Sequence, residues 1–236
     1  MNKIGLLIPK TNLTVEYELQ DLIRKKFFDL DKICFYIMKL DYKTKYTDNK
    51  QAFLTDIAID IKNKISDLNY IGVKDYYFFC TSSAIENELY EIYNPATAIV
   101  SEAKQRKIKE CYLITPYNEK LGINVKKALE KNNIKVNKIV NFDLLNTEEY
   151  FDFGINNLEK YIIETYKKEY GDIIISCTNL PTIHFIGRLE KKLNVKTISS
   201  NSCMFKMIKK KEDLWKKKKL KWYWTFVANN QMLRKM

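Results

Sequence analysis

Residues 171–182, GDIIISCTNLPT, put a thiol at the end of an apolar run. Three isoleucines and a serine are typical of a buried strand that ends at Cys177, and the Thr-Asn pair after it is typical of the start of a helix. Residues 74–85, KDYYFFCTSSAI, have the same pattern: an apolar strand, Cys80 and then Thr-Ser-Ser. These junctions predict parallel strands that each end in a cysteine and lead into a helix.

Strand and helix patterns alternate on both sides of the two junctions. The expected strands are residues 3–9, 32–40, 75–80, 110–117, 134–142 and 172–177. The expected helices include residues 14–30, 52–68, 94–109, 118–133 and 156–170. Because the pattern restarts near residue 109, we predict an α/β fold of two pseudo-symmetric half-domains, each a mostly parallel sheet flanked by helices. The halves are residues 1–108 and 109–205, and a basic C-terminal segment covers residues 206–236.

The two halves correspond position by position. Pro9 and Pro116 end the first strand of each half, and Cys80 and Cys177 end the third. Ligands of open parallel sheets bind beyond the carboxyl ends of the strands. We therefore expect all four strand ends to face one cleft between the halves, which would hold the active site.

A cysteine at a single strand end is most often a packing residue, because cysteine is among the most buried residue types. Two cysteines in the same context favour chemistry instead. The N-terminus of a helix favours a thiolate, and its N–H groups, with the hydroxyls of Thr81, Ser82 and Thr178, could hold a substrate carboxylate. Facing thiols could move a proton from one face of a carbon to the other, or one could attack while the other delivers a proton.

Other chemistries lack the residues that they need. The chain has five widely spaced cysteines and one histidine, so neither a zinc site nor a disulfide framework is expected. It has no G-x-S-x-G, P-loop or G-x-G-x-x-G motif. No apolar run approaches 18 residues, which predicts a cytoplasmic protein without a membrane span. We expect structural roles for the remaining thiols and the histidine: Cys34, Cys111, Cys203 and His184.

The net charge of +12 is concentrated at the C-terminus. Residues 206–236 hold eleven Lys or Arg and two acidic residues, a net charge of +9, which leaves +3 for residues 1–205. This segment could bind nucleic acid or another anionic surface. The simpler interpretation is a solvated lysine-rich terminus.

Five separated motifs resemble the aspartate/glutamate racemase superfamily, and within it the branch of maleate cis-trans isomerases and arylmalonate decarboxylases. They are IGLLIPKTNLTVEYE at residues 4–18, CTSS at 80–83, LITPYNEKLG at 113–122, SCTNLPT at 176–182 and ISSNS at 198–202. The resemblance covers most of residues 3–205. It implies an enzyme that needs no cofactor, with its site between two α/β halves.

The resemblance also implies roles for individual residues. Cys80 would be a nucleophile that adds to the double bond of a cis-diacid, and Cys177 would donate and accept the proton. Asn12 and Tyr117 would bind a substrate carboxylate, with helix capping and core packing as their respective alternatives. Thr178 and Asn179 would serve both the helix start and carboxylate binding.

Tyr150 stands where the isomerases carry another carboxylate-binding asparagine, and Lys206 stands where the family usually has a tryptophan. Because of these two departures, the resemblance does not identify the substrate.

Several functions remain after this comparison. Both cysteines are present, which argues against the decarboxylase but not against an amino-acid racemase that transfers protons between two thiols. The contexts of Asn12 and Tyr117 favour the isomerase. A carboxylate-binding relative without activity is a further alternative. The expected partners are a small dicarboxylate or amino-acid substrate and a second copy of the chain, in a homo-oligomer that we expect to be a dimer. No membrane partner is expected, and nucleic acid is the less favoured one.

Overall fold

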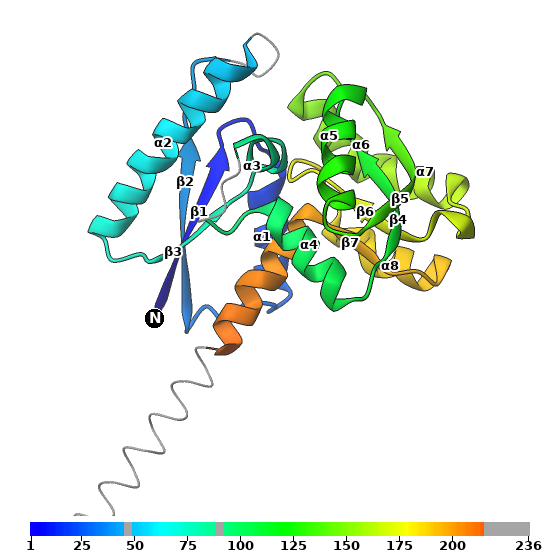
Figure 1. Cartoon of the computed structure of the whole chain (residues 1–236). Helices are drawn as coiled ribbons and strands as arrows, with labels where there is room; N and C mark the ends of the chain where they lie inside the picture. The colour runs from blue at the N-terminus through cyan, green and yellow to red at the C-terminus, as the bar shows by residue number, and fades with distance from the viewer. Residues whose placement is uncertain (45–48, 88–91, 215–236) are drawn as a thin grey trace, which may run out of the picture.

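The computed structural model describes residues 1–44, 49–87 and 92–214 of the chain. Two parallel sheets form its framework (Figure 1). The first has the order β2-β1-β3, from β1 (Asn2–Pro9), β2 (Ile33–Leu40) and β3 (Asp75–Phe78). The second has the order β5-β4-β6-β7, from β4 (Glu110–Thr115), β5 (Lys135–Asn141), β6 (Asp172–Ile175) and β7 (Thr197–Ser199). The predicted α/β class, with a parallel sheet in each half, is confirmed.

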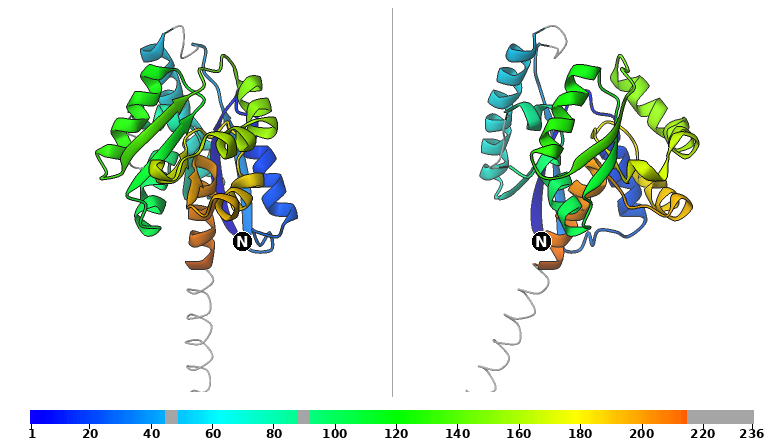
Figure 2. Two further views of the ribbon diagram at one scale, coloured as in Figure 1. Left: turned by 90° about the vertical axis from the view of Figure 1, so that its right-hand side faces the viewer. Right: turned by 45° about the vertical axis from the view of Figure 1, so that its right-hand side comes forward.

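Helices cover both sheets. The first half has α1 (Thr14–Arg24), α2 (Lys50–Tyr70), α3 (Thr81–Asn87) and α4 (Pro95–Gln105). The second has α5 (Glu119–Glu130), α6 (Thr147–Asn156), α7 (Leu158–Thr165), the 3-10 turn η1 (Lys168–Tyr170) and α8 (Ile183–Leu193). Residues 200–214 form a further helix. This helix, α1 and α4 lie between the sheets, whereas α2 covers the outer face of the first sheet (Figures 1 and 2).

The central strand β1 shows why the two halves share one core. Ile4, Leu6 and Ile8 lie on one face of the first sheet and join the apolar cluster that continues into the second half. Leu7 lies on the other face and packs with the apolar residues of α2. This alternation follows from the two-residue period of a strand. Burial of each of these side chains contributes about 1.5–3 kcal/mol to folding. The strand β1 therefore packs against apolar residues on both faces of the first sheet.

Asparagine side chains fix where several helices begin. The side-chain oxygens of Asn49, Asn94, Asn118 and Asn146 each accept the backbone N–H of the third residue after them. Each cap contributes about 1 kcal/mol because it satisfies an N–H group that the helix leaves free. The cap at Asn146 begins α6, a helix that the sequence pattern did not predict.

One local expectation is wrong. Thr178 and Asn179 do not begin a helix, because α8 begins at Ile183. Residues 178–182 instead form a turn whose polar groups bond α1, as described below. The division between residues 108 and 109 remains a prediction.

The helix of residues 200–214 includes the first part of the expected basic segment, and residues 215–236 lie outside the described residues. No described helix is both long and apolar enough to cross a lipid bilayer.

Candidate active site

The turns that carry the two cysteines are hydrogen-bonded to each other. Cys80 stands between β3 and α3, and Cys177 follows β6. The hydroxyl of Thr178, directly after Cys177, donates to the carbonyl oxygen of Phe79, directly before Cys80, at 3.0 Å. The carboxyl ends of strands from both halves therefore meet at one place, as the rule for parallel sheets predicts.

Cys177 lies deep in the site as a protonated thiol. Its side chain is 4% exposed. Burial raises its pKa to about 12, although the Tyr117 hydroxyl and the backbone N–H of Asn179 oppose this shift by hydrogen bonding to the sulfur. The nitrogen of Asn179 is 3.3 Å from Sγ. The free helix N-terminus expected to favour a thiolate here is absent from the described turn, so desolvation dominates. A neutral thiol at neutral pH is suited to donating a proton.

Cys80 is the more accessible of the two thiols. Its Sγ donates to the hydroxyl oxygen of Ser83 at 3.2 Å and lies 3.5 Å from that of Ser82. Hydroxyl groups rotate, so both serines can donate to the sulfur once it loses its proton. This arrangement places two hydroxyl groups beside the more accessible sulfur.

Tyr117 is hydrogen-bonded to Cys177 and lies near Cys80. Its side chain is 6% exposed and comes from the segment after β4. Burial raises its pKa well above the ordinary value, and its hydrogen bond to Cys177 and the nearby Cys80 sulfur act in the same direction. The phenol is therefore neutral, and it donates a hydrogen bond to the Cys177 sulfur.

The Asn12 side chain bonds groups from both halves of the chain. Its Oδ1 accepts the N–H groups of Thr14 and Val15 at 2.9 and 3.0 Å, so it caps α1. Its Nδ2 lies 3.4 Å from the hydroxyl of Thr178. The side-chain oxygen of Asn12 therefore caps the helix, which was the alternative to carboxylate binding. Its amide nitrogen faces the turn of Cys177.

The remaining predicted residues are held by the same elements. Oδ1 of Asn179 accepts the N–H of Leu13 at 2.9 Å, and the Thr81 hydroxyl pairs with that of Ser200 at 3.0 Å. The predicted site residues from the two halves, Asn12, Cys80, Thr81, Ser82, Tyr117, Cys177, Thr178 and Asn179, gather around the carboxyl ends of β1, β3, β4 and β6.

Tyr42 is a neighbour of Cys80 that the sequence analysis missed. It follows the carboxyl end of β2, and its hydroxyl lies 2.8 Å from that of Thr11. Burial raises its pKa, and the nearby Cys80 sulfur adds to the shift. Tyr42 could have been predicted from the sequence because it stands two residues after the end of β2. The predicted site residues follow the ends of the other strands in the same way.

Tyr150 belongs to the same site from the side of the second half. It lies on α6, where Gly154, one turn later, packs against Pro181 of the Cys177 turn. Residues four apart share a helix face, so Tyr150 also faces this turn. Burial raises its pKa, with the Cys177 sulfur as the next cause. Tyr150, the departure noted in the sequence, therefore lies beside Cys177.

The thiols and the histidine expected to be structural lie away from this cluster. Burial raises the pKa of both Cys111 and Cys203 to about 12, and both side chains are in the shared core. Cys34 is half-buried in β2. His184 packs edge-on against Phe185 in α8. Over residues 1–44, 49–87 and 92–214, no group of three His, Cys, Asp or Glu side chains is arranged to hold a metal ion.

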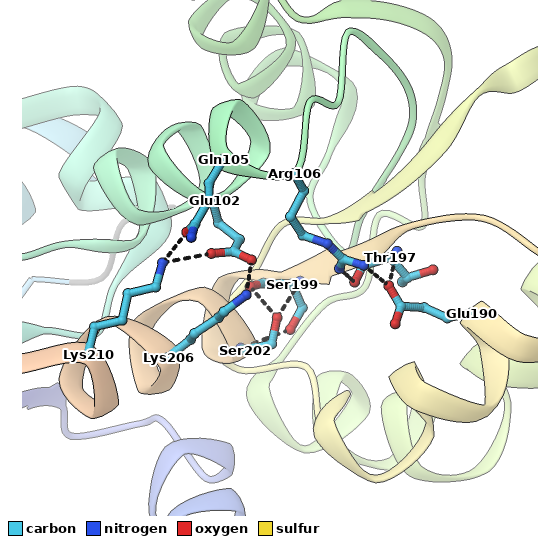
Figure 3. A network of polar contacts seen from close by, with 9 residues as sticks. All are labelled: Glu102, Gln105, Arg106, Glu190, Thr197, Ser199, Ser202, Lys206 and Lys210. Atoms are coloured by element: carbon cyan, nitrogen blue, oxygen red, sulfur yellow. Dashed lines mark hydrogen bonds and ion pairs between the residues drawn. The ribbon is translucent and has the colours of Figure 1, made fainter. Parts of the chain in front are cut away.

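The described lysines of the basic segment are paired with polar groups of the protein. Lys206 and Lys210 both contact Glu102 of α4, and Lys210 also contacts Gln105 (Figure 3). Lys209 pairs with Glu212 and Lys211 with Asp75. Lys206, Lys210 and Lys211 therefore attach this helix to α4 and β3, whereas the Lys209–Glu212 pair lies within the helix. Residues 215–236, the rest of the basic segment, lie outside the described residues.

The chain is similar to maleate isomerases in sequence, and to maleate isomerases and arylmalonate decarboxylase in fold. No family model matches the chain. It is 19% identical over 217 residues to a maleate isomerase of Alcaligenes faecalis, over 84% of this chain and 86% of that protein. The structure of Nocardia farcinica maleate cis-trans isomerase bound to TRIS matches with a TM-score of 0.76 at 15% identity, covering 90% and 93% of the two chains.

Two further structures belong to the same comparison. A cysteine-to-serine mutant of the Nocardia farcinica isomerase, with a covalently bound succinylcysteine intermediate, matches at a TM-score of 0.71 and 15% identity over 86% and 89% of the chains. Arylmalonate decarboxylase matches at 0.62 and 15% identity over the same shares. The resemblance predicted from the sequence is confirmed.

Proposed function

We propose that the protein is a cis-trans isomerase of a small dicarboxylic acid such as maleate, with Cys80 as nucleophile and Cys177 as proton donor and acceptor. The observation that carries the proposal is the pairing of the two cysteine turns, with Tyr117 close to both sulfurs. The likeness to maleate isomerases in fold and along most of the chain supports it.

The reaction can be written with every bond accounted for. The Cys80 thiolate adds to one alkene carbon, a carbon–sulfur bond forms, and the neighbouring carbon takes the proton of the Cys177 thiol. The product is a succinyl thioether on Cys80. Rotation about the new carbon–carbon single bond turns one carboxylate to the other side. The Cys177 thiolate then removes the proton, the carbon–sulfur bond breaks, and the trans-diacid leaves.

The different environments of the two sulfurs match these roles. A donor must carry a proton when the carbanion forms, and burial keeps Cys177 protonated. A nucleophile must reach the substrate, and Cys80 is the more exposed sulfur, with the hydroxyls of Ser82 and Ser83 beside it. The covalent succinylcysteine described for the Nocardia farcinica enzyme is the same type of intermediate.

The carboxylates of the substrate would be held by neutral donors. We assign this role to the Asn12 amide, to the hydroxyls of Thr81, Ser82 and Thr178, and to Asn179 and Tyr117. No described residue of this group is cationic, so hydrogen bonds to charged oxygens would provide the affinity, at about 1.5–3 kcal/mol each. Tyr150 would limit the space beside Cys177.

Incubation with maleate, followed by detection of fumarate, tests the proposal. Cys80→Ser and Cys177→Ser should each lower turnover by several orders of magnitude. In Cys177→Ser, water would have to supply the proton slowly, and no thiolate would remove it again, so a succinyl adduct on Cys80 should accumulate that mass spectrometry detects. The matched control is Cys111→Ser, because that thiol lies in the core away from the site. Full activity in both site variants would sink the two-cysteine mechanism.

An amino-acid racemase would give a different result. Solvent deuterium would enter the α-position of aspartate, and maleate would not be converted. Fumarate formation from maleate and deuterium entry into aspartate thus separate the two reactions.

A further inference from the structure

Glu18 is a buried carboxylate outside the reacting group. It lies on α1, is 1% exposed, and contacts no Lys, Arg or His among the described residues. Its Oε1 accepts the backbone N–H groups of Thr182 and Ile183, the latter at 2.7 Å. Its Oε2 accepts from Nδ2 of Asn201. Glu18 therefore joins the first half of the chain to the turn after Cys177 and to the helix of residues 200–214.

Asn201 determines which form of Glu18 fits. Its Nδ2 also donates to the carbonyl oxygen of Thr178 at 3.0 Å, so the amide cannot be turned without placing two oxygens against each other. Nδ2 must then donate to Oε2 of Glu18. Both carboxylate oxygens accept hydrogen bonds, so the described contacts fit the ionised form, which predominates above the raised pKa of about 7.

The α1 helix holds the Cys177 turn at both ends. Near its start, the Thr14 hydroxyl donates to the carbonyl oxygen of Asn179 at 2.8 Å, and the N–H of Leu13 donates to the Asn179 side chain. One turn later, Glu18 holds Thr182. Asn201 holds the first residue of the turn, Thr178. The backbone from 178 to 183 is thus fixed by groups of the other half and of one distant helix.

We propose that Glu18, together with Asn201, is a positioning residue that sets the placement of the Cys177 thiol against the substrate. This inference rests on the proposed function. A buried charge without a counter-ion is costly for stability, so a neutral contact would hold the fold at lower cost. What the charge adds is several strong, directed hydrogen bonds to a single turn. A displacement of about 1 Å at a reacting group can lower a rate about 100-fold.

Two variants test the role. Glu18→Gln removes the charge and sets an amide nitrogen against Nδ2 of Asn201, whereas Asn201→Ala removes the contact to Thr178 and leaves the carboxylate in place. Asp21→Asn is the matched control, since Asp21 lies on the same helix and pairs with Lys25 near the surface. The measurements are kcat and KM for maleate per folded molecule, well below the melting temperature. The rates of iodoacetamide labelling at Cys177 and Cys80, resolved by peptide mass spectrometry, complete the set.

In both variants we expect kcat to fall about 100-fold with KM little changed. Labelling of the buried Cys177 should become faster, labelling of Cys80 should not change, and Asp21→Asn should behave as the wild type. Wild-type kcat and wild-type Cys177 labelling in folded Glu18→Gln or Asn201→Ala would overturn the inference. If Glu18→Gln does not fold, Asn201→Ala decides.

If the wild type does not convert maleate, the proposed function fails. The rates of iodoacetamide labelling then still test the positioning role of Glu18. Faster labelling of Cys177 in the variants then supports the positioning role, and unchanged labelling overturns it.

Discussion

Replacement of Gly154 by alanine tests how closely α6 and the Cys177 turn are packed. A methyl group at this position would lie 2.5 Å from Cδ of Pro181, 3.0 Å from its nitrogen and 3.1 Å from its carbonyl oxygen. These are ring and backbone atoms that cannot rotate away. Gly187, in the middle of α8, is the matched control, because a methyl group there meets no atom within 4 Å.

The two substitutions should change the free energy of unfolding in opposite directions. Alanine in place of a mid-helix glycine stabilises a helix by about 0.5–1 kcal/mol. Gly187→Ala should therefore gain about that amount. At Gly154 the same gain is outweighed by an overpacking cost of about 1–3 kcal/mol. We expect Gly154→Ala to be destabilised by up to about 2 kcal/mol.

Urea unfolding of the two variants and the wild type measures this difference. Each kcal/mol corresponds to a shift in melting temperature of about 2–4 °C for a protein of this size. Turnover of maleate should also fall in Gly154→Ala alone, because the helix that would be displaced carries Tyr150 and contacts the turn of Cys177. A Gly154→Ala protein as stable and as active as Gly187→Ala would refute this account of the packing.

Three further predictions follow from the site. Burial raises the pKa of Glu18 from 4.5 to about 7, so the folded state binds this proton more tightly and the free energy of unfolding should fall by about 3 kcal/mol as pH rises from below 4.5 to above 7. Subtracting the pH profile of Glu18→Gln from that of the wild type measures this contribution, and a difference that does not vary with pH would contradict the shift. Tyr117→Phe removes a hydrogen bond that lowers the pKa of Cys177, so alkylation of Cys177 at pH 9 should slow, and a faster rate would argue against the contact. Tyr150→Phe should raise KM for maleate about tenfold if its hydroxyl meets a substrate carboxylate, whereas an unchanged KM would limit Tyr150 to shaping the site.

The sequence predicted the positions of both cysteines because strand ends are local signals. An apolar run followed by small polar residues marked Cys80 and Cys177, and the rule for parallel sheets indicated that they would meet. The order of strands within each sheet was not predicted, since it depends on packing between segments far apart in the chain.

Contacts across the two halves explain what the sequence analysis missed. Thr178 and Asn179 have the composition of a helix start, but their side chains bond Phe79 and Leu13 instead. Glu18 has the composition of a surface residue, yet it lies on the helix face marked by Val15 and Leu19. A charged residue on the apolar face of an amphipathic helix was the signal that could have found it.

The hold of α1 on the Cys177 turn also has a consequence for biosynthesis. The contacts of Glu18 with Thr182 and Asn201 span 164 and 183 residues of sequence. A nascent chain makes α1 early and must wait for most of the remaining polypeptide before these contacts can form. Contacts this distant are costly to close and slow to appear during folding. The contacts that join Glu18 and Thr178 to Asn201 can therefore form only after translation has passed residue 201, so an incomplete chain on the ribosome lacks them.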